Sequence, residues 1–271
     1  MHTVLDLFAG IGGFSLGLER VGDGYFKTGA FCEIDEAARK VLTKHWPDVK
    51  IYNDIKELTN EQLQADGIRP SVITGGFPCQ DIAGQGGGAG IVHGHRSSLW
   101  KEMFRLCRNV QPEWVIVENV PLLRSKGLQV VIENFCEIGY VGEFHCLPAS
   151  ACCGAPHQRD RLWIIANPGR KPEGAAKSGP SYKPLDGDSE GERPEAGDGS
   201  RNLCANVARL DGHLREAIGR APPWPVEPRV GRTVSDGLPG RMDRIRQLGN
   251  AVVPQIPQLI GEAIMEYEKN E

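Results

Sequence analysis

The chain has 271 residues, of which 40% are hydrophobic and 24% charged. This composition is ordinary for a folded globular protein, and the length allows one large core or a core domain with a smaller second lobe. A formal net charge of −4 argues against a protein that coats nucleic acid indiscriminately, although it allows a local basic face.

Two absences in the sequence bear on location. The N-terminus lacks a basic start followed by a long apolar run, and no later segment approaches the length needed to span a bilayer. The eight cysteines form no C-x-x-C pair, and the adjacent Cys152 and Cys153 suit neither an ordinary disulfide nor a zinc site. We therefore expect a cytoplasmic protein with reduced thiols, no membrane partner and no metal.

Residues 3–8 form a short apolar run that predicts a buried strand, followed by a glycine-rich turn and a helix. This order allows backbone N–H groups to approach a cofactor closely. The glycine spacing is not that of a dinucleotide-binding protein, because a G-x-G-x-x-G pattern that begins at Gly10 has Ser15 in place of its third glycine. A nicotinamide oxidoreductase is thereby disfavoured.

Acidic residues follow the next predicted strands. Residues 27–34 form a strand that ends in Glu33, Asp35 is the expected N-cap of the following helix, and Asp54 follows a third short strand. Glu33 is suited to bind both hydroxyls of a ribose, and Asp54 could accept a hydrogen bond from an adenine amino group. Taken singly, each acid is more often a solvated cap or turn residue, but their succession favours a binding site.

Residues 71–80 contain an apolar run that breaks at two glycines and delivers Pro78 and Cys79 to the carboxyl end of a sheet. We predict that Cys79 is a nucleophile, because a thiolate is the strongest nucleophile among side chains near neutral pH. The alternative is a small buried hydrophobic residue. The loop that follows contains Gly86, Gly87 and Gly88, and such loops serve as lids.

The next buried strand, residues 114–117, leads to Glu118, which we place on the same sheet edge as Cys79. Strands are also expected at 144–149 and 162–166, and the latter is preceded by Arg159 and Arg161. Arg159 and Arg161 alternate along an extended segment, so both can face the cleft only if the backbone there is irregular.

The composition changes at residue 167, where proline, glycine and charge indicate a linker or disordered loop. Residues 201–250 then hold nine arginines against five acids, which suits phosphates and guanine edges or, alternatively, a solvated helix face. An amphipathic helix closes the chain, and we expect it to return to the first domain. Its apolar residues are Leu259, Ile260, Ala263, Ile264 and Tyr267.

Taken together, seven segments resemble, in order, the motifs of the DNA cytosine-5 methyltransferase family. They are DLFAGIGGFSLGLE, CEID with Glu33, Asp54-Ile55, GGFPCQ, Glu118-Asn119-Val120, HQRDRLWIIA and LGNAVVP. One such motif is weak evidence, whereas seven in register are strong. The resemblance covers 4–166 and 247 to the C-terminus and implies a bacterial or phage type of enzyme.

The resemblance implies S-adenosyl-L-methionine as cofactor and double-stranded DNA as partner. Cys79 would add to C6 of a flipped-out cytosine, Glu118 would stabilise N3, Arg161 would hold O2, and Arg159 would support the loop or the thiolate. Glu33 would bind the cofactor's ribose. The implied cofactor-binding residues are Phe8, Gly10, Gly12, Glu33, Ile34, Asp54, Ile55, Pro78, Leu99, Asn250 and Val252.

The fold class predicted is α/β, a Rossmann-like doubly wound sheet of the S-adenosylmethionine-dependent methyltransferases. We predict a catalytic domain at 1–168, completed by a C-terminal helix at 247–271, and a short target-recognition region at 169–246 with a Pro/Gly-rich loop at 169–200. A tRNA cytosine-5 methyltransferase and a catalytically silent DNA-binding relative are the alternatives. The sequence does not identify a cognate restriction endonuclease.

Overall fold

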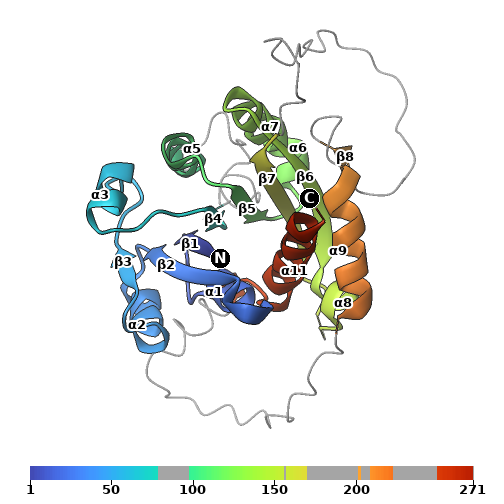
Figure 1. The fold of residues 1–271 in the computed structure, drawn as a ribbon, viewed down its shortest axis with the longest axis horizontal. Helices are drawn as coiled ribbons and strands as arrows, with labels where there is room; N and C mark the ends of the chain where they lie inside the picture. Colours follow the sequence, from blue (N-terminus) through green and yellow to red (C-terminus); the bar gives the residue numbers. More distant parts are fainter. Residues whose placement is uncertain (79–97, 156, 170–200, 203–207, 222–248, 271) are drawn as a thin grey trace.

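The computed structural model describes residues 1–78, 98–155, 157–169, 201–202, 208–221 and 249–270. Within these ranges the strands form one eight-stranded sheet in the order β3-β2-β1-β4-β5-β7-β6-β8 (Figure 1). The strands are β1 His2–Leu7, β2 Phe26–Cys32, β3 Lys50–Tyr52, β4 Val72–Gly75, β5 Trp114–Asn119, β6 Tyr140–Pro148, β7 Asp160–Pro168 and β8 Arg201–Asn202.

Strands β1 to β5 pair in parallel, and β7 runs antiparallel to both of its neighbours, β5 and β6. The sequence predicted seven of these eight strands, but not β8 and not all of the limits of the others. Strand β2 ends at Cys32, so that Glu33 and Ile34 lie in the following turn. Strand β6 begins at Tyr140, earlier than expected, because Gly139 takes a positive φ of 78° that ends the preceding helix and lets the strand start at once.

Helices cover both faces of the sheet. They are α1 Gly13–Leu18, the 3-10 helix η1 Gly22–Gly24, α2 Glu36–His45, α3 Asn60–Ala65, α5 Ser98–Val110, α6 Leu123–Lys126, α7 Leu128–Glu137, α8 Ala149–Cys153, α9 Ala208–Arg220 and α11 Gln255–Lys269. Residues of α3, α5 and α7 pack with one face, and residues of α1, α8, α9 and α11 pack with the other. None of the helices in the described ranges is long and apolar enough to cross a bilayer.

Alternation along the strands explains this three-layer arrangement. Val115 of β5 belongs to the first core, and its neighbours Trp114 and Ile116 belong to the second. Successive side chains of a strand point to opposite faces, so strands that are apolar throughout require a cover on both sides. The near-continuous apolar runs in the sequence therefore dictate a sheet buried between two helical layers.

The C-terminal helix α11 packs against α1 and α9, as Figure 1 shows. Four of the five residues predicted to form its apolar face are buried, and Tyr267 is partly buried. Contact with α1 is close, since a Cβ on Gly17 would lie 2.1 Å from the carbonyl oxygen of Pro254. The sequence analysis gave a solvated helix face as one alternative for this region and did not foresee the buried face of α9. Its buried residues are Leu210, Leu214 and Ala217.

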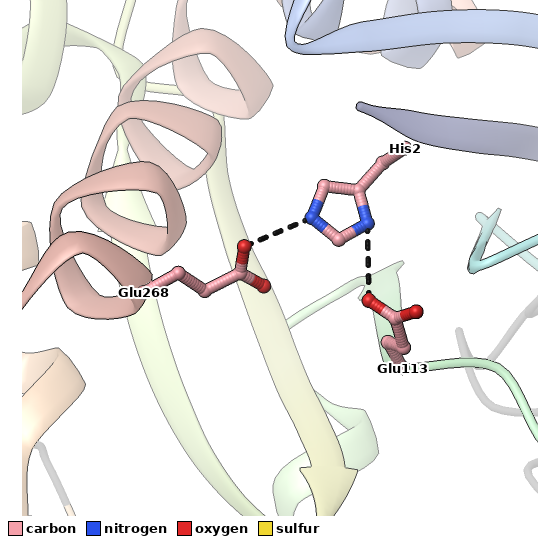
Figure 2. Close-up of side chains that lie close together, drawn as sticks. All are labelled: His2, Glu113 and Glu268. Atoms are coloured by element: carbon pink, nitrogen blue, oxygen red, sulfur yellow. Dashed lines mark hydrogen bonds and ion pairs between the residues drawn. The ribbon is translucent and has the colours of Figure 1, made fainter. Parts of the chain in front are cut away.

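The ends of the chain are joined by a polar cluster on the side of the sheet where β1 begins (Figure 2). His2 lies between two carboxylates, with Nε2 3.1 Å from Glu268 and Nδ1 3.4 Å from Glu113. Glu268 also accepts hydrogen bonds from Tyr25 and from Trp114 Nε1, the latter at 2.6 Å. Burial opposes ionisation of Glu268, but these donors outweigh it and hold its pKa at about 2.

Candidate functional site

The carboxyl ends of the parallel strands meet at one edge of the sheet. Leu7 at the end of β1 is paired with Cys32 of β2 and with Gly75 of β4, and Gly75 is paired with Val117 of β5. Ligands of open α/β sheets bind at such an edge. The predicted site residues that follow or lie near these strand ends are Phe8, Gly10, Gly12, Glu33, Ile34, Asp54, Ile55, Pro78 and Glu118.

The turn after β1 has an unusual backbone. Phe8, Gly10 and Gly12 have positive φ angles of 53°, 54° and 85°. A Cβ on Gly12 would lie 2.6 Å from the ring of Trp46, so only glycine fits at this position. A Cβ on Gly10 would meet no atom of the described residues within 4 Å, which leaves open space over this part of the turn.

Glu33 connects the turn after β1 to the turn after β2. Its Oε2 accepts a hydrogen bond from the N–H of Gly10 at 2.7 Å, and its Oε1 accepts one from the N–H of Asp35 at 2.8 Å. Asp35 caps α2 by accepting from Ala37 at 2.8 Å, as predicted. Next to it, Ile34 is 72% exposed, which is unusual for so apolar a side chain.

Asp6 of β1 holds the start of α1, which follows the turn after β1. It is fully buried and accepts hydrogen bonds from the hydroxyls of Ser15 and Thr74, each at 2.9 Å. Burial raises its pKa to about 7, although these donors favour the charged form. The sequence analysis did not single out Asp6, and its position inside an apolar strand was the available signal.

Asp54 and Ile55 lie beyond the end of β3. Asp54 accepts a hydrogen bond from the N–H of Lys56 at 2.9 Å and lines a small cavity of about 180 Å³. Ile55 is buried in the core. Leu99, at the start of α5, is partly buried against the same core.

Glu118 and Arg161 form the most buried ion pair among the predicted residues. Arg161 Nε lies 2.8 Å from Glu118 Oε1, and the Glu118 side chain is only 13% exposed. Burial raises the pKa of Glu118, and the positive charges of Arg161 and Arg159 oppose that rise. The other carboxylate oxygen, Oε2, would lie 2.9 Å from a Cβ on Gly76, so this glycine allows the close approach of Glu118.

The neighbour of Glu118 holds the segment that leads to Cys79. Asn119 is buried and donates a hydrogen bond from Nδ2 to the carbonyl oxygen of Phe77 at 3.1 Å. Phe77 packs on the Trp100 ring, with centroids 5.4 Å apart, and Pro78 is exposed. Cys79, together with the loop at 86–88, lies outside the described residues.

The backbone at Arg159 is irregular, which is the condition under which both arginines can face one cleft. Its φ is 37°, and both Arg159 and Arg161 line a cavity of about 620 Å³. The Arg159 guanidinium donates to the carbonyl oxygens of Gly249 at 2.8 Å and Ala251 at 2.5 Å. Two of the predicted motifs, far apart in sequence, are joined by these bonds.

The large cavity is completed by segments that the sequence analysis did not assign to it. Ile11 of the first turn, Leu16 of α1 and His157 lie in its wall, as does the predicted residue Val252. Asn250 is exposed and is not among the residues lining it. Glu33, Ile34 and Asp54 are likewise not in this wall, so the predicted residues divide between the first turn, the small cavity and the large one.

Comparison with known proteins identifies the family. A family model described as C-5 cytosine-specific DNA methylase matches residues 2–195. The chain belongs to this family. Among curated members, it is 37% identical over 172 residues to the type II methyltransferase M2.BsuMI of Bacillus subtilis (strain 168), covering 60% of this chain and 41% of that protein.

Other relatives give the same result. The type II methyltransferase M.CviJI of Paramecium bursaria Chlorella virus IL3A is 35% identical over 163 residues, which cover 60% of this chain and 42% of that protein. The methylase chain thus spans about two fifths of the length of these curated relatives.

Solved structures share the fold. The solved structure of a protein encoded within a prophage (E. coli) superposes with a TM-score of 0.60 at 18% identity and covers all of both chains. DNMT2 from Spodoptera frugiperda superposes with a TM-score of 0.51 at 20% identity, over 62% of this chain and 50% of that one. The methylase family member described here therefore has the Rossmann-like, doubly wound fold predicted from its sequence.

Proposed function

We propose that this chain is a DNA cytosine-5 methyltransferase that transfers a methyl group from S-adenosyl-L-methionine to C5 of a flipped-out cytosine. The observation that carries the proposal is the buried Glu118–Arg161 pair, in which Glu118 Oε2 approaches Gly76 so closely that an added Cβ there would lie 2.9 Å from it, three residues before Cys79 in the sequence. A nucleophile, an acid and a cation at one sheet edge are what addition to a cytosine ring requires.

The cofactor proposal is supported by the first turn. Open space over Gly10, the Glu33 carboxylate and the exposed Ile34 suit a nucleoside with a ribose and a flat base. Glu33 would bind the ribose hydroxyls, Ile34 would pack on the adenine, and Asp54 with Ile55 would contact its edge. Phe8, Gly10 and Gly12 would lie against the cofactor, and Pro78, Leu99, Asn250 and Val252 would complete its pocket. S-adenosyl-L-methionine supplies an electrophilic methyl group.

Cys79 would begin the reaction, because C5 of an intact cytosine ring is a poor nucleophile. Addition of its thiolate to C6 pushes electrons toward N3, where the Glu118 carboxyl donates or shares its proton. The raised pKa of Glu118 suits this role. After C5 is methylated and the sulfur of the methyl donor leaves as a neutral thioether, loss of the C5 proton to a base, departure of the thiolate from C6 and return of the N3 proton to Glu118 would restore the ring.

The two arginines would have different tasks. Arg161 would hold O2 of the cytosine while it orients Glu118 through the observed 2.8 Å contact. Arg159 would support the cleft, and its two carbonyl contacts tie it to residues 249 and 251. A thiol with a pKa near 8.5 is only a few per cent ionised at pH 7, a cost of about 2 kcal/mol that nearby guanidinium groups would reduce.

DNA would be bound with the target base out of the stack, because C6 is inaccessible inside a duplex. We propose that residues 1–168 and 247–271 carry the chemistry and that the arginine-rich region within 169–246 contacts the duplex. Within this region the structure describes the secondary structure elements β8 and α9.

The test is incorporation of labelled methyl groups into duplex DNA and, in parallel, into tRNA. We expect duplex DNA to be the acceptor and Cys79→Ser and Glu118→Gln to abolish or strongly reduce turnover. Cys146→Ser, at an exposed cysteine, is the matched control and should retain activity. Ordinary turnover by Cys79→Ser would refute the role of the thiolate, and methylation of tRNA alone would replace DNA as the substrate. Bisulfite sequencing of DNA from cells expressing the chain would then identify the target sequence.

A further inference from the structure

Three groups of histidine and carboxylate side chains lie close together in the described part of the chain. They are His2 with Glu113 and Glu268, His213 with Glu216 and Glu266, and Glu143 with His145 and Asp211. In the first group, shown in Figure 2, protein donors already surround Glu268. In the second group, Arg220 binds Glu266 at 2.8 Å. The third group differs from both.

Glu143 and His145 stand two residues apart on β6, so their side chains share one face of the sheet. Asp211 reaches them from α9, the helix that covers this face. His145 Nε2 lies 3.0 Å from Glu143 Oε2, and His145 Nδ1 lies 3.7 Å from Asp211 Oδ1. Glu143 and His145 are 1% and 6% exposed, which makes this the most enclosed of the three groups.

The buried carboxylate of Glu143 is incompletely satisfied. Within the described residues, its Oε1 is shielded from solvent and accepts no hydrogen bond. A buried carboxylate oxygen without a donor or cation is costly, so such atoms require an explanation. The two carboxylate oxygens of Asp211 have different neighbours. Arg215 contacts Oδ2 at 2.8 Å, and Oδ1 faces His145.

We propose that Glu143, His145 and Asp211 bind a divalent transition-metal ion, with Zn²⁺ as the probe. One imidazole nitrogen and two carboxylate oxygens are a ligand set that Zn²⁺ accepts, with solvent in the fourth position. Zinc–ligand bonds of about 2.1 Å place tetrahedral ligand atoms about 3.4 Å apart. One ligand atom from each residue already lies within 4.8 Å of the others. Glu143 and Asp211 approach different nitrogens of the His145 ring, so closing the site requires the side chains to turn until one nitrogen faces both carboxylates.

The ion would fasten α9 to the sheet. Helix α9 packs against the sheet through its buried apolar residues Leu210, Leu214 and Ala217. It also packs on α11. A metal bound only by the folded chain stabilises that state by mass action. Because α9 lies within the proposed target-recognition region, the ion would hold that region in register with the catalytic sheet. This inference is independent of the proposed methyl transfer, since metal binding is measured without substrate.

The experiment is calorimetric titration of the chelator-treated full chain with Zn²⁺ in the presence of a reductant. We expect one equivalent to bind and Asp211→Asn to weaken binding at least about a hundredfold, because second-shell changes alone cost about 10–100-fold. Glu216→Gln, an exposed residue on the same helix, is the matched control and should bind as the wild type does. Asp211 has a 25% exposed side chain, so its substitution is compatible with folding.

Two further measurements separate a metal site from a simple ion pair. Asp211→His supplies a new nitrogen ligand but no negative charge, so it should restore Zn²⁺ binding if the ion is the occupant. With Co²⁺ in place of Zn²⁺, the spectrum should lack the thiolate charge-transfer band that cysteine ligands give. Wild-type binding no tighter than that of Asp211→Asn, failure of Asp211→His to bind, or a thiolate band would each overturn the proposal, leaving His145 as an ion-pair partner of its two carboxylates.

Discussion

Substitution of Gly76 by alanine tests the proposed arrangement of Glu118 directly. The added Cβ would lie 2.9 Å from Glu118 Oε2, closer than the roughly 3.4 Å of ordinary carbon–oxygen contact. Gly76 has no positive φ, so the cost of Gly76→Ala is this contact and not backbone strain. Glu118 cannot simply rotate away, since its Oε1 is bonded to Arg161 and its side chain is largely buried.

Relief of the contact requires a shift of about 0.5 Å in the carboxylate or the strand. A misplacement of 1 Å at a reacting group can cost about 100-fold, so we expect kcat to fall about tenfold. KM for DNA should change little, because the contact of Glu118 with N3 strengthens as charge develops in the transition state. Overpacking should also lower the free energy of unfolding by about 1 kcal/mol.

Steady-state methylation of duplex DNA and urea denaturation measure both effects. Gly212→Ala is the matched control, because a Cβ at this helical glycine of α9 would meet no described atom within 4 Å. It should leave kcat unchanged and stabilise the chain by about 0.5–1 kcal/mol. In a Glu118→Ala background, Gly76→Ala should lose its cost in stability. A kcat for Gly76→Ala within twofold of wild type, or a cost that persists without Glu118, would refute the reasoning.

Three other substitutions test the supports of the site and fold. The folded pKa of Asp6, about 7, lies above its ordinary value of 3.8, so the stability gained from its protonation is fully present below about pH 4 and is lost as pH rises to 7. The free energy of unfolding of wild type relative to Asp6→Asn, from urea denaturation, should therefore fall by up to about 4 kcal/mol between pH 4 and 8. Asn119→Ala leaves the Phe77 carbonyl without its donor and should cost about 1–3 kcal/mol in the same assay, with a lower kcat; unchanged stability would contradict the hydrogen bond. The pKa of Glu268, about 2, lies below its ordinary value of 4.5, so its contribution to the free energy of unfolding is present above pH 4.5 and is lost as pH falls toward 2. Glu268→Gln should be less stable than wild type at pH 7 by thermal denaturation, and this difference in stability should shrink between pH 4.5 and 2.

Most of the sheet could be predicted from sequence because its central strands are apolar runs, and glycine or an acidic residue lies at or near the ends of several of them. The limits of β1 and β4 differ from expectation by a residue or so. The buried face of α9 was missed because the arginines and acids of this segment favour a solvated helix face or a nucleic-acid contact. Its buried residues Leu210, Leu214 and Ala217 recur at helical spacing, and that period was the signal available in the sequence.

The contacts within the site were less accessible to sequence reasoning. Alternation along 159–161 predicted that both arginines face one cleft only with an irregular backbone, and the φ of 37° at Arg159 meets that condition. The sequence could not indicate that the carbonyls of residues 249 and 251 receive this guanidinium. Partners ninety residues away are chosen by the packing of the whole molecule, and local propensity carries no information about them.

The turns of the site are fastened to one another across the sheet edge as well as to the core beneath them. Glu33, after β2, holds the N–H of Gly10 after β1, and Asn119 of β5 holds the carbonyl of Phe77 after β4. Each bond joins a turn to the neighbouring strand end, so the position of each turn depends partly on that strand end. A substitution at one strand end should therefore also weaken the contribution that the turn after the neighbouring strand makes to ligand binding. This gives a physical reason why motifs separated by tens of residues act as one site.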